Sequence, residues 1–101
     1  DGATAVKEND TPVVSNYSLA QNYPNPFNPT TTIEYTLQSS EHVSLQVFNL
    51  LGEQVASLVN SVQSSGEYRV QFDGADLTGG VYFYQLQAGD FSTTRRMVLL
   101  K

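Results

Sequence analysis

Apolar and polar residues alternate along most of the chain after residue 16. In residues 30–37, Ile33, Tyr35 and Leu37 share one parity, and threonine and glutamate side chains occupy the other. A period of two is typical of a strand that buries one face. The same alternation, interrupted by turn residues, predicts seven short strands, at residues 17–20, 30–37, 42–48, 54–59, 67–73, 81–87 and 91–100. No segment has a helical period, so the chain is predicted to be an all-β antiparallel sandwich.

Glycine-containing turns separate the predicted strands. Residues 49–52 end in Gly52, which supplies the positive φ that a tight hairpin needs. Gly80 and Tyr82 open the sixth strand, where immunoglobulin-like sandwiches carry a tyrosine that bonds back across a corner. Tyr84 stands where antibody domains have a disulfide cysteine, and this chain has no cysteine. The pattern therefore favours an Ig-like sandwich in which aromatic packing replaces the bridge.

Three prolines within six residues interrupt the alternation before the second strand. We name this segment the proline strap; it reads Tyr23-Pro24-Asn25-Pro26-Phe27-Asn28-Pro29. Each proline fixes its own φ, lacks an N–H and moves the preceding residue out of helical geometry, so a stiff, kinked segment is predicted. Its two rings, Tyr23 and Phe27, are expected to plug a core that the rest of the chain builds. Its asparagines are expected to bond to nearby backbone groups.

The chain has 101 residues, the size of one small domain. Residues 1–16 are polar and show no period, so they are predicted to be a flexible linker, with the domain at residues 17–101. The sequence has no initiator methionine or signal peptide, and we expect it to be part of a longer protein. No apolar run is long enough to predict a membrane span.

Charge is unevenly distributed along the chain. Ten acidic residues face five basic ones, for a net charge of −5, which argues against nucleic acid as a partner. From residue 91 onward, however, the chain carries three cations (Arg95, Arg96 and Lys101) and no acidic side chain. Such an asymmetry is typical of an interaction end.

Residues that could carry chemistry are sparse. His42 is the only histidine, and its place at the start of a strand favours a solvated side chain over a catalytic base. No serine elbow and no zinc-ligand set is present, so the chain is predicted not to be an enzyme and to need no cofactor. Two possible binding sites would involve sets of several residues. Acids in or near turns leave a calcium site open, although their spacing matches no EF-hand loop: Glu67, Asp73, Asp76 and Asp90. Aromatic rings leave a sugar-stacking platform open: Tyr23, Phe27, Tyr82, Phe83 and Tyr84.

Residues 18–33, which contain the proline strap, strongly resemble the opening of the type A C-terminal sorting domain of the type IX secretion system, the Por secretion sorting domain family. Later motifs fit the same family: Val47-Phe48-Asn49-Leu50-Leu51-Gly52 with Val55, Gly66-Glu67-Tyr68, Gly80-Val81-Tyr82-Phe83-Tyr84 and Arg96-Met97-Val98-Leu99-Leu100-Lys101. The resemblance covers residues 17–101. It departs from the family at Phe48-Asn49, where an acidic residue is frequent, and at Arg96, where lysine is common.

The resemblance implies a secretion signal with no enzymatic activity of its own. Such domains follow a covalently attached N-terminal cargo, which reaches the periplasm by a signal peptide. The outer-membrane translocon recognises the folded domain and exports the cargo to the cell surface or the medium. A cell-surface sortase-like protease then removes the domain within the linker, here residues 1–16. A chain that ends at Lys101 fits a signal that must be terminal.

We expect the last predicted strand to carry the recognition signal. Its cationic and apolar residues are Arg95, Arg96, Met97, Val98, Leu99, Leu100 and Lys101, and the apolar ones do not alternate at the end, so one apolar pair is expected to face outward. The alternative is that both faces of the strand are buried and the charges only keep an edge soluble. A receptor could pair with the edge of this strand and read its side chains. Two alternatives remain open on the sequence: an Ig-like accessory or binding module of a secreted or surface enzyme, and a structural spacer.

Overall fold

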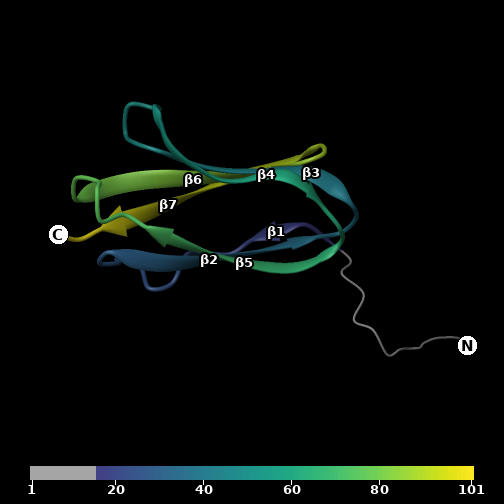
Figure 1. Ribbon diagram of the computed structural model, residues 1–101, viewed down its shortest axis with the longest axis horizontal. Helices are drawn as coiled ribbons and strands as arrows, with labels where there is room; N and C mark the ends of the chain where they lie inside the picture. The colour runs from purple at the N-terminus through teal and green to yellow at the C-terminus, as the bar shows by residue number, and fades with distance from the viewer. Residues whose placement is uncertain (1–15) are drawn as a thin grey trace, which may run out of the picture.

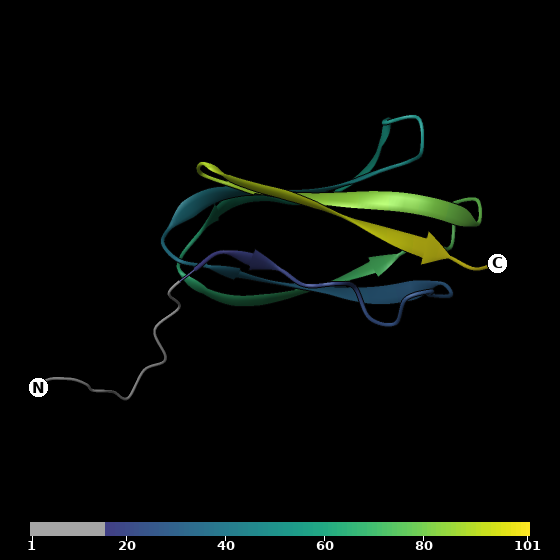
Figure 2. The same ribbon diagram turned by 180° about the vertical axis from the view of Figure 1, so that it is seen from behind.

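The protein is an antiparallel β-sandwich in the computed structural model, which describes residues 16–101 (Figures 1 and 2). Its strands are β1 (Ser18–Leu19), β2 (Thr30–Leu37), β3 (Glu41–Phe48), β4 (Gln54–Gln63), β5 (Gly66–Asp73), β6 (Gly80–Ala88) and β7 (Phe91–Leu99). Sheet A has the order β1-β2-β5 and sheet B the order β4-β3-β6-β7. No helix occurs among residues 16–101. The predicted all-β sandwich of seven strands is confirmed.

The strands that alternate most clearly in the sequence also bury one face most completely. Their inward side chains fill the space between the sheets: Ile33, Tyr35 and Leu37 of β2, Val43, Leu45 and Val47 of β3, Tyr82, Tyr84 and Leu86 of β6. The edge strands β4 and β5 are less enclosed. Val55 and Leu58 of β4, and Tyr68 and Val70 of β5, are only partly buried against this core. The predicted inward faces are thus confirmed, with weaker burial at the edges.

One predicted boundary is wrong. The fourth predicted strand was expected to end at residue 59, but β4 continues to Gln63 because the start of β3 pairs with it, at Val43 opposite Ser61 and Glu41 opposite Gln63. Register shifts at Leu45/Gln46 and Val47/Phe48 show bulges in this pairing. A bulge breaks the alternation of a strand, and an edge strand tolerates polar side chains on both faces, so the local pattern looked like a loop.

The two tyrosines predicted to mark an Ig-like sandwich lie where that fold needs them. The Tyr82 hydroxyl donates to the Thr78 carbonyl oxygen at 2.6 Å, which is a tyrosine corner. Tyr84 is fully buried, and its hydroxyl donates to the carbonyl oxygen of Ala20 at 2.7 Å. Tyr84 thereby ties β6 of one sheet to the segment that follows β1 of the other. The fourth strand pairs with β3 rather than joining sheet A, unlike in constant-type immunoglobulin domains.

Candidate functional site

The proline strap lies in the connection from β1 to β2, both strands of sheet A (Figure 2). At its start, Tyr23 exchanges backbone hydrogen bonds with Thr32 of β2, at 3.0 and 2.9 Å. At its end, the Phe27 N–H donates to the Val98 carbonyl oxygen at 2.9 Å, and the Leu100 N–H donates to the Phe27 carbonyl oxygen at 2.8 Å. All three X-Pro peptide bonds in the strap are cis. The strap therefore joins β2 of sheet A to β7 of sheet B.

The two rings of the strap have opposite environments. Phe27 is 1% exposed and meets Phe72 edge-on, with ring centroids 6.1 Å apart, so its predicted role as a plug is confirmed. Tyr23 is 80% exposed, and the same prediction is wrong for it. Because Tyr23 pairs with Thr32, it shares the parity of the β2 side chains that face away from the core. Its ring therefore lies on the outer face of sheet A.

A buried polar residue that the sequence did not single out holds the start of the strap. Asn22 is 2% exposed, and its side-chain amide donates to the Pro24 carbonyl oxygen at 3.2 Å and to Thr31 Oγ1 at 3.0 Å. The Thr31 hydroxyl donates to the same carbonyl at 2.8 Å, and the Asn22 N–H donates to the Tyr84 hydroxyl at 2.7 Å. An asparagine this close to a proline-rich segment is typical of an exposed turn, so nothing in the sequence alone indicated that Asn22 is buried.

Asn25 also has a role other than the predicted one. It was expected to bond locally, but its side-chain oxygen accepts a hydrogen bond from the Val98 N–H at 3.0 Å, across 73 residues. This contact extends the pairing between the strap and β7. The strap asparagine thus connects distant segments instead of closing its own turn.

Strand β7 lies at the edge of sheet B, as predicted, but the strap already occupies much of that edge. The outward backbone groups of Val98 and the N–H of Leu100 bind Asn25 and Phe27, and the Arg96 carbonyl oxygen accepts from Gln21 Nε2 at 2.7 Å. An incoming strand therefore cannot pair with β7 near its end. For residues 96–100, the predicted pairing of a receptor strand with the edge of β7 is wrong. A segment about 70 residues earlier in the chain already bonds to the backbone groups of this edge.

The side chains of β7 divide as the lack of alternation predicted. Met97 and Leu99 are fully buried, whereas Val98 is half-buried and Leu100 is 51% exposed on the other side. One apolar pair thus faces outward. The strap covers the backbone edge of this strand but does not bury the side chains of Val98 and Leu100. These side chains remain available to contact a partner.

The three cations near the end of the chain have different environments. Arg95 Nε donates to the Leu19 carbonyl oxygen, and Lys101 Nζ donates to the Ala75 carbonyl oxygen, both at 2.5 Å. The Arg96 guanidinium is exposed and makes no hydrogen bond or ion pair with any residue of 16–101. Arg95 and Lys101 therefore help to hold the fold, and Arg96 is the cation left for a partner.

The other residues of the family motifs, Gly52, Gly66, Tyr68 and Gly80, have structural roles. Gly52 has φ +83° in the β3–β4 hairpin, as predicted. Gly66 and Gly80 begin β5 and β6. Tyr68 stacks on Tyr35 with ring centroids 5.3 Å apart, and its hydroxyl donates to the Ser64 carbonyl oxygen at 2.7 Å.

Burial affects two tyrosines of the core. It raises the pKa of the Tyr84 phenol above its ordinary value of 10.0, although the bond from the Asn22 backbone and the nearby Arg95 charge partly oppose the shift. Burial also raises the pKa of the Tyr35 phenol, against the opposing hydrogen bond to Gln63. The Tyr84 hydroxyl therefore remains protonated at neutral pH and can donate to the Ala20 carbonyl.

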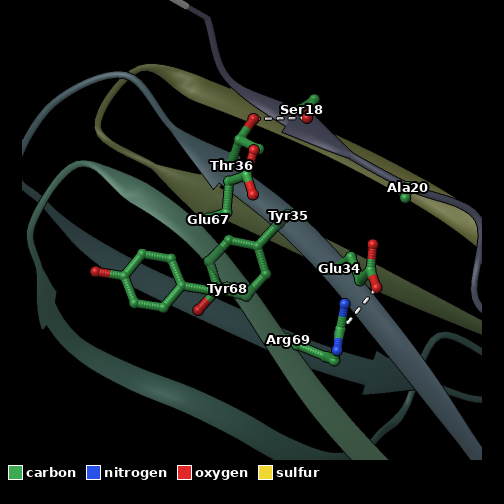
Figure 3. Close-up of a pocket in the computed structure, with 8 residues that line it drawn as sticks. All are labelled: Ser18, Ala20, Glu34, Tyr35, Thr36, Glu67, Tyr68 and Arg69. Carbon is green, nitrogen blue, oxygen red and sulfur yellow. Dashed lines mark hydrogen bonds and ion pairs between the residues drawn. The ribbon is translucent and has the colours of Figure 1, made fainter. Parts of the chain in front are cut away.

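A shallow hollow of about 330 Å³ lies on sheet A, between β1, β2 and β5 (Figure 3). Two of its three charged groups are paired, since Arg69 Nε lies 2.9 Å from Glu34 Oε2, and Ser18 bonds to Thr36; Glu67 is the third. Within residues 16–101, no three His, Asp or Glu side chains gather closely enough to hold a metal ion, so the acids considered for calcium do not form a site. The hollow carries no arrangement that points to catalysis.

The rings considered for a sugar platform do not gather on one surface. Phe27, Tyr82 and Tyr84 belong to the core. Tyr23 faces outward on sheet A, and Phe83, which pairs with Phe48 and Arg96, has the outward parity of sheet B. The exposed Tyr23 ring and the half-buried Phe83 ring thus lie on opposite faces of the sandwich, and the platform interpretation is wrong.

Comparison with known proteins agrees with the motifs. A family model described as "Secretion system C-terminal sorting domain" matches residues 21–100, from just before the proline strap to the end of β7 and one residue beyond. A search of curated proteins found no match. In the part of the chain that the structure describes, no helix is long and apolar enough to cross a membrane.

Proposed function

The chain belongs to the C-terminal sorting domain family of the type IX secretion system, and from this we propose that it directs an attached cargo protein through the outer-membrane translocon. The family is one of sorting signals and not of enzymes. Its membership implies interaction with the type IX secretion machinery and export to the cell surface or the medium. The match of residues 21–100 to the family carries this proposal.

We infer that the machinery reads the folded domain and not a linear peptide. The strap and the end of β7 are far apart in the sequence, and backbone hydrogen bonds from Phe27 to Val98 and Leu100 bring them together. A receptor that contacts both segments needs the sandwich to have formed. Within this surface, the side chains of Arg96, Val98 and Leu100 face outward and bind no other group of residues 16–101, whereas the exposed Arg95 and Lys101 bond to backbone carbonyls.

The linker belongs to the same proposal. A sortase-like protease at the cell surface would cut within residues 1–16 after the cargo has passed through the periplasm and the translocon. Residues 1–15 lie outside the described residues, and the linker assignment rests on their polar, aperiodic sequence. An extended, accessible backbone is what a protease requires.

The proposal is tested by fusing this chain behind a reporter with an N-terminal signal peptide in a type IX-competent host. We expect the reporter outside the cell, and in the periplasm when the translocon is deleted. Retention in the periplasm of the competent host would refute the function. Arg96→Gln is expected to reduce export, and Arg69→Gln is the matched control, because its exposed ion pair with Glu34 contributes little to stability.

Removing Leu100 and Lys101 is a poor test of recognition. The Leu100 N–H binds the Phe27 carbonyl oxygen, and Lys101 binds Ala75, so a truncation would loosen the strap as well as remove side chains. Leu100→Ser keeps the backbone bond and removes only the exposed apolar side chain. A folded Leu100→Ser variant that is exported like the parent would place recognition elsewhere.

A further inference from the structure

The two outer faces of the sandwich differ in chemistry. The outward positions of sheet A include three acids, Glu34, Glu67 and Asp73. In the four strands of sheet B the only acidic residue is Glu41, which has the parity of the buried Val43 and accepts a hydrogen bond from the Tyr17 hydroxyl at 2.7 Å. A chain of net charge −5 thus presents one sheet face without outward carboxylates.

Apolar side chains gather on this acid-free face of sheet B. Phe48 of β3 lies opposite Phe83 of β6, and Val81 of β6 lies opposite Val98 of β7; all four are half-buried. Natural strands with one solvent-exposed face usually place polar residues at these positions. The apolar cluster therefore marks a surface that is suited to cover by a partner.

The β3–β4 hairpin rises from the sheet beside this cluster (Figure 1). Its tip exposes Leu50 by 68% and Leu51 by 83%. Asn49 holds the hairpin rigid, because its side-chain oxygen accepts from the N–H groups of Leu51 at 2.9 Å and Glu53 at 3.0 Å. The turn is closed by Asn49 and Gly52 and needs no leucine, so the two apolar side chains contribute nothing visible to folding.

Hollows flank the hairpin on the sheet. One of about 280 Å³ is lined by residues that include Phe48, Leu50 and Phe83. Another of about 230 Å³ is lined by residues that include Leu51 and Val81. Each can receive an apolar side chain, and the hairpin leucines stand between them.

Arg96 supplies a charge at the same place. It lies opposite Phe83 in the pairing of β6 and β7, and its guanidinium is exposed and unpaired among residues 16–101. The other cations in that part of the chain bind Glu34 or backbone carbonyls. An unpaired arginine beside apolar side chains is complementary to a carboxylate flanked by apolar groups.

We propose that the hairpin end of the acid-free outer face of sheet B, around Phe48, Phe83 and Arg96, together with the β3–β4 hairpin docks a segment of a secretion-machinery protein that presents apolar side chains beside a carboxylate. This inference rests on the proposed function and names its contact surface. A negatively charged lipid surface fits less well, because residues 17–101 carry seven acidic and four basic side chains and the domain is itself negatively charged. A second copy docked by the same face would bring no carboxylate from its strands to Arg96, and the hairpin carboxylate of Glu53 already accepts a hydrogen bond from Asn49 Nδ2 at 2.8 Å.

The inference is tested with the reporter fusion and paired variants. Leu50→Ser combined with Leu51→Ser is expected to lower export at least about tenfold, as truncation of interface anchors does, with an unchanged melting temperature. Val62→Ser is the matched control, because Val62 is 70% exposed on β4 of the same sheet but pairs with His42, away from the hairpin. Arg96→Glu should lower export more than Arg96→Lys, which keeps the charge.

A photo-crosslinking amino acid at position 51 identifies what the hairpin touches during export, with position 62 as the comparison. We expect position 51 to crosslink to an outer-membrane protein of the secretion machinery and position 62 not to do so. Crosslinks only to lipid, only to another copy of this chain, equally from both positions, or not at all would overturn the inference.

The outcomes separate the inference from the function on which it rests. If the parent fusion stays in the periplasm, the proposed function fails. If the parent is exported and the Leu50/Leu51 double variant is exported equally well, only the docking surface fails. A melting temperature that falls in the double variant contradicts the claim that these leucines stand outside the fold.

Discussion

Phe27 is predicted to be the most costly side chain of the proline strap to remove. It is 1% exposed, contacts Phe72, and lies near Leu99 and Gly74. Gly74 has no side chain that could fill the space left by the ring. Phe27→Ala therefore leaves a cavity and should lower the free energy of unfolding by about 3–5 kcal/mol. A domain of this size has a total stability of about 5–15 kcal/mol, so the loss is a large fraction of the whole.

The assay is thermal and urea unfolding of the parent and two strap variants. Tyr23→Ala is the matched control, since it removes a ring from the same strap, but one that is 80% exposed, and should change stability by no more than about 0.5 kcal/mol. For a domain of up to about 100 residues, each 1 kcal/mol corresponds to roughly 4–8 °C, so Phe27→Ala should lower the melting temperature by at least about 12 °C.

Equal effects of the two variants would refute this reasoning. A small loss for Phe27→Ala would show that the strap detaches from the sandwich at little cost and that the ring is not part of the cooperative core. If that variant kept its stability but lost export, Phe27 would be read by the secretion machinery directly. The unfolding curves and the export assay together distinguish the two roles.

Four further predictions concern single hydrogen bonds, one titrating group and one close contact. Tyr84→Phe should cost about 2–3 kcal/mol, because the buried N–H of Asn22 and the Ala20 carbonyl each lose a partner. Because folding raises the pKa of the Tyr84 phenol, the contribution of this group to the free energy of unfolding should be fully present below pH 10.0 and should be lost as pH rises through the raised pKa. Urea unfolding across alkaline pH should therefore show a smaller loss of stability for Tyr84→Phe than for the parent. Asn49→Ala should cost about 1–2 kcal/mol by thermal unfolding, through three lost hairpin bonds. Gly74→Ala should cost about 1–3 kcal/mol in the same assay, because the added Cβ would lie 3.1 Å from a methyl group of Leu99; a stabilised variant would show that this site can expand.

Alternation was sufficient to predict the strands that bury one complete face. In β2, β3 and β6 the inward residues recur at every second position, and the two-residue repeat of a strand places them on one face whatever the rest of the chain does. The turn at Gly52 and the corner bond of Tyr82 follow in the same way from local backbone geometry. These features were predicted correctly because neighbours in the sequence determine them.

For the proline strap, the sequence predicted some features and not others. Its stiffness and the burial of one ring could be predicted, since proline acts on its own and the preceding residue and a large aromatic favours the core. Which ring enters the core could not. Pairing with Thr32 turns Tyr23 to the outer face, and pairing with β7 turns Phe27 inward, and both depend on where the sheets meet.

The candidate site depended still more on tertiary structure. From the sequence, Arg95, Arg96 and Lys101 formed one cationic end, but folding places backbone carbonyls beside two of them and leaves Arg96 without a partner among the described residues. The composition of each outer face and the cover over the β7 edge are likewise set by segments that meet across the chain. Periodicity alone determined which side of a strand is apolar, because strand geometry is local. The partner that each polar group finds was decided only by the fold, because hydrogen bonds act over about 3 Å in space and not along the sequence.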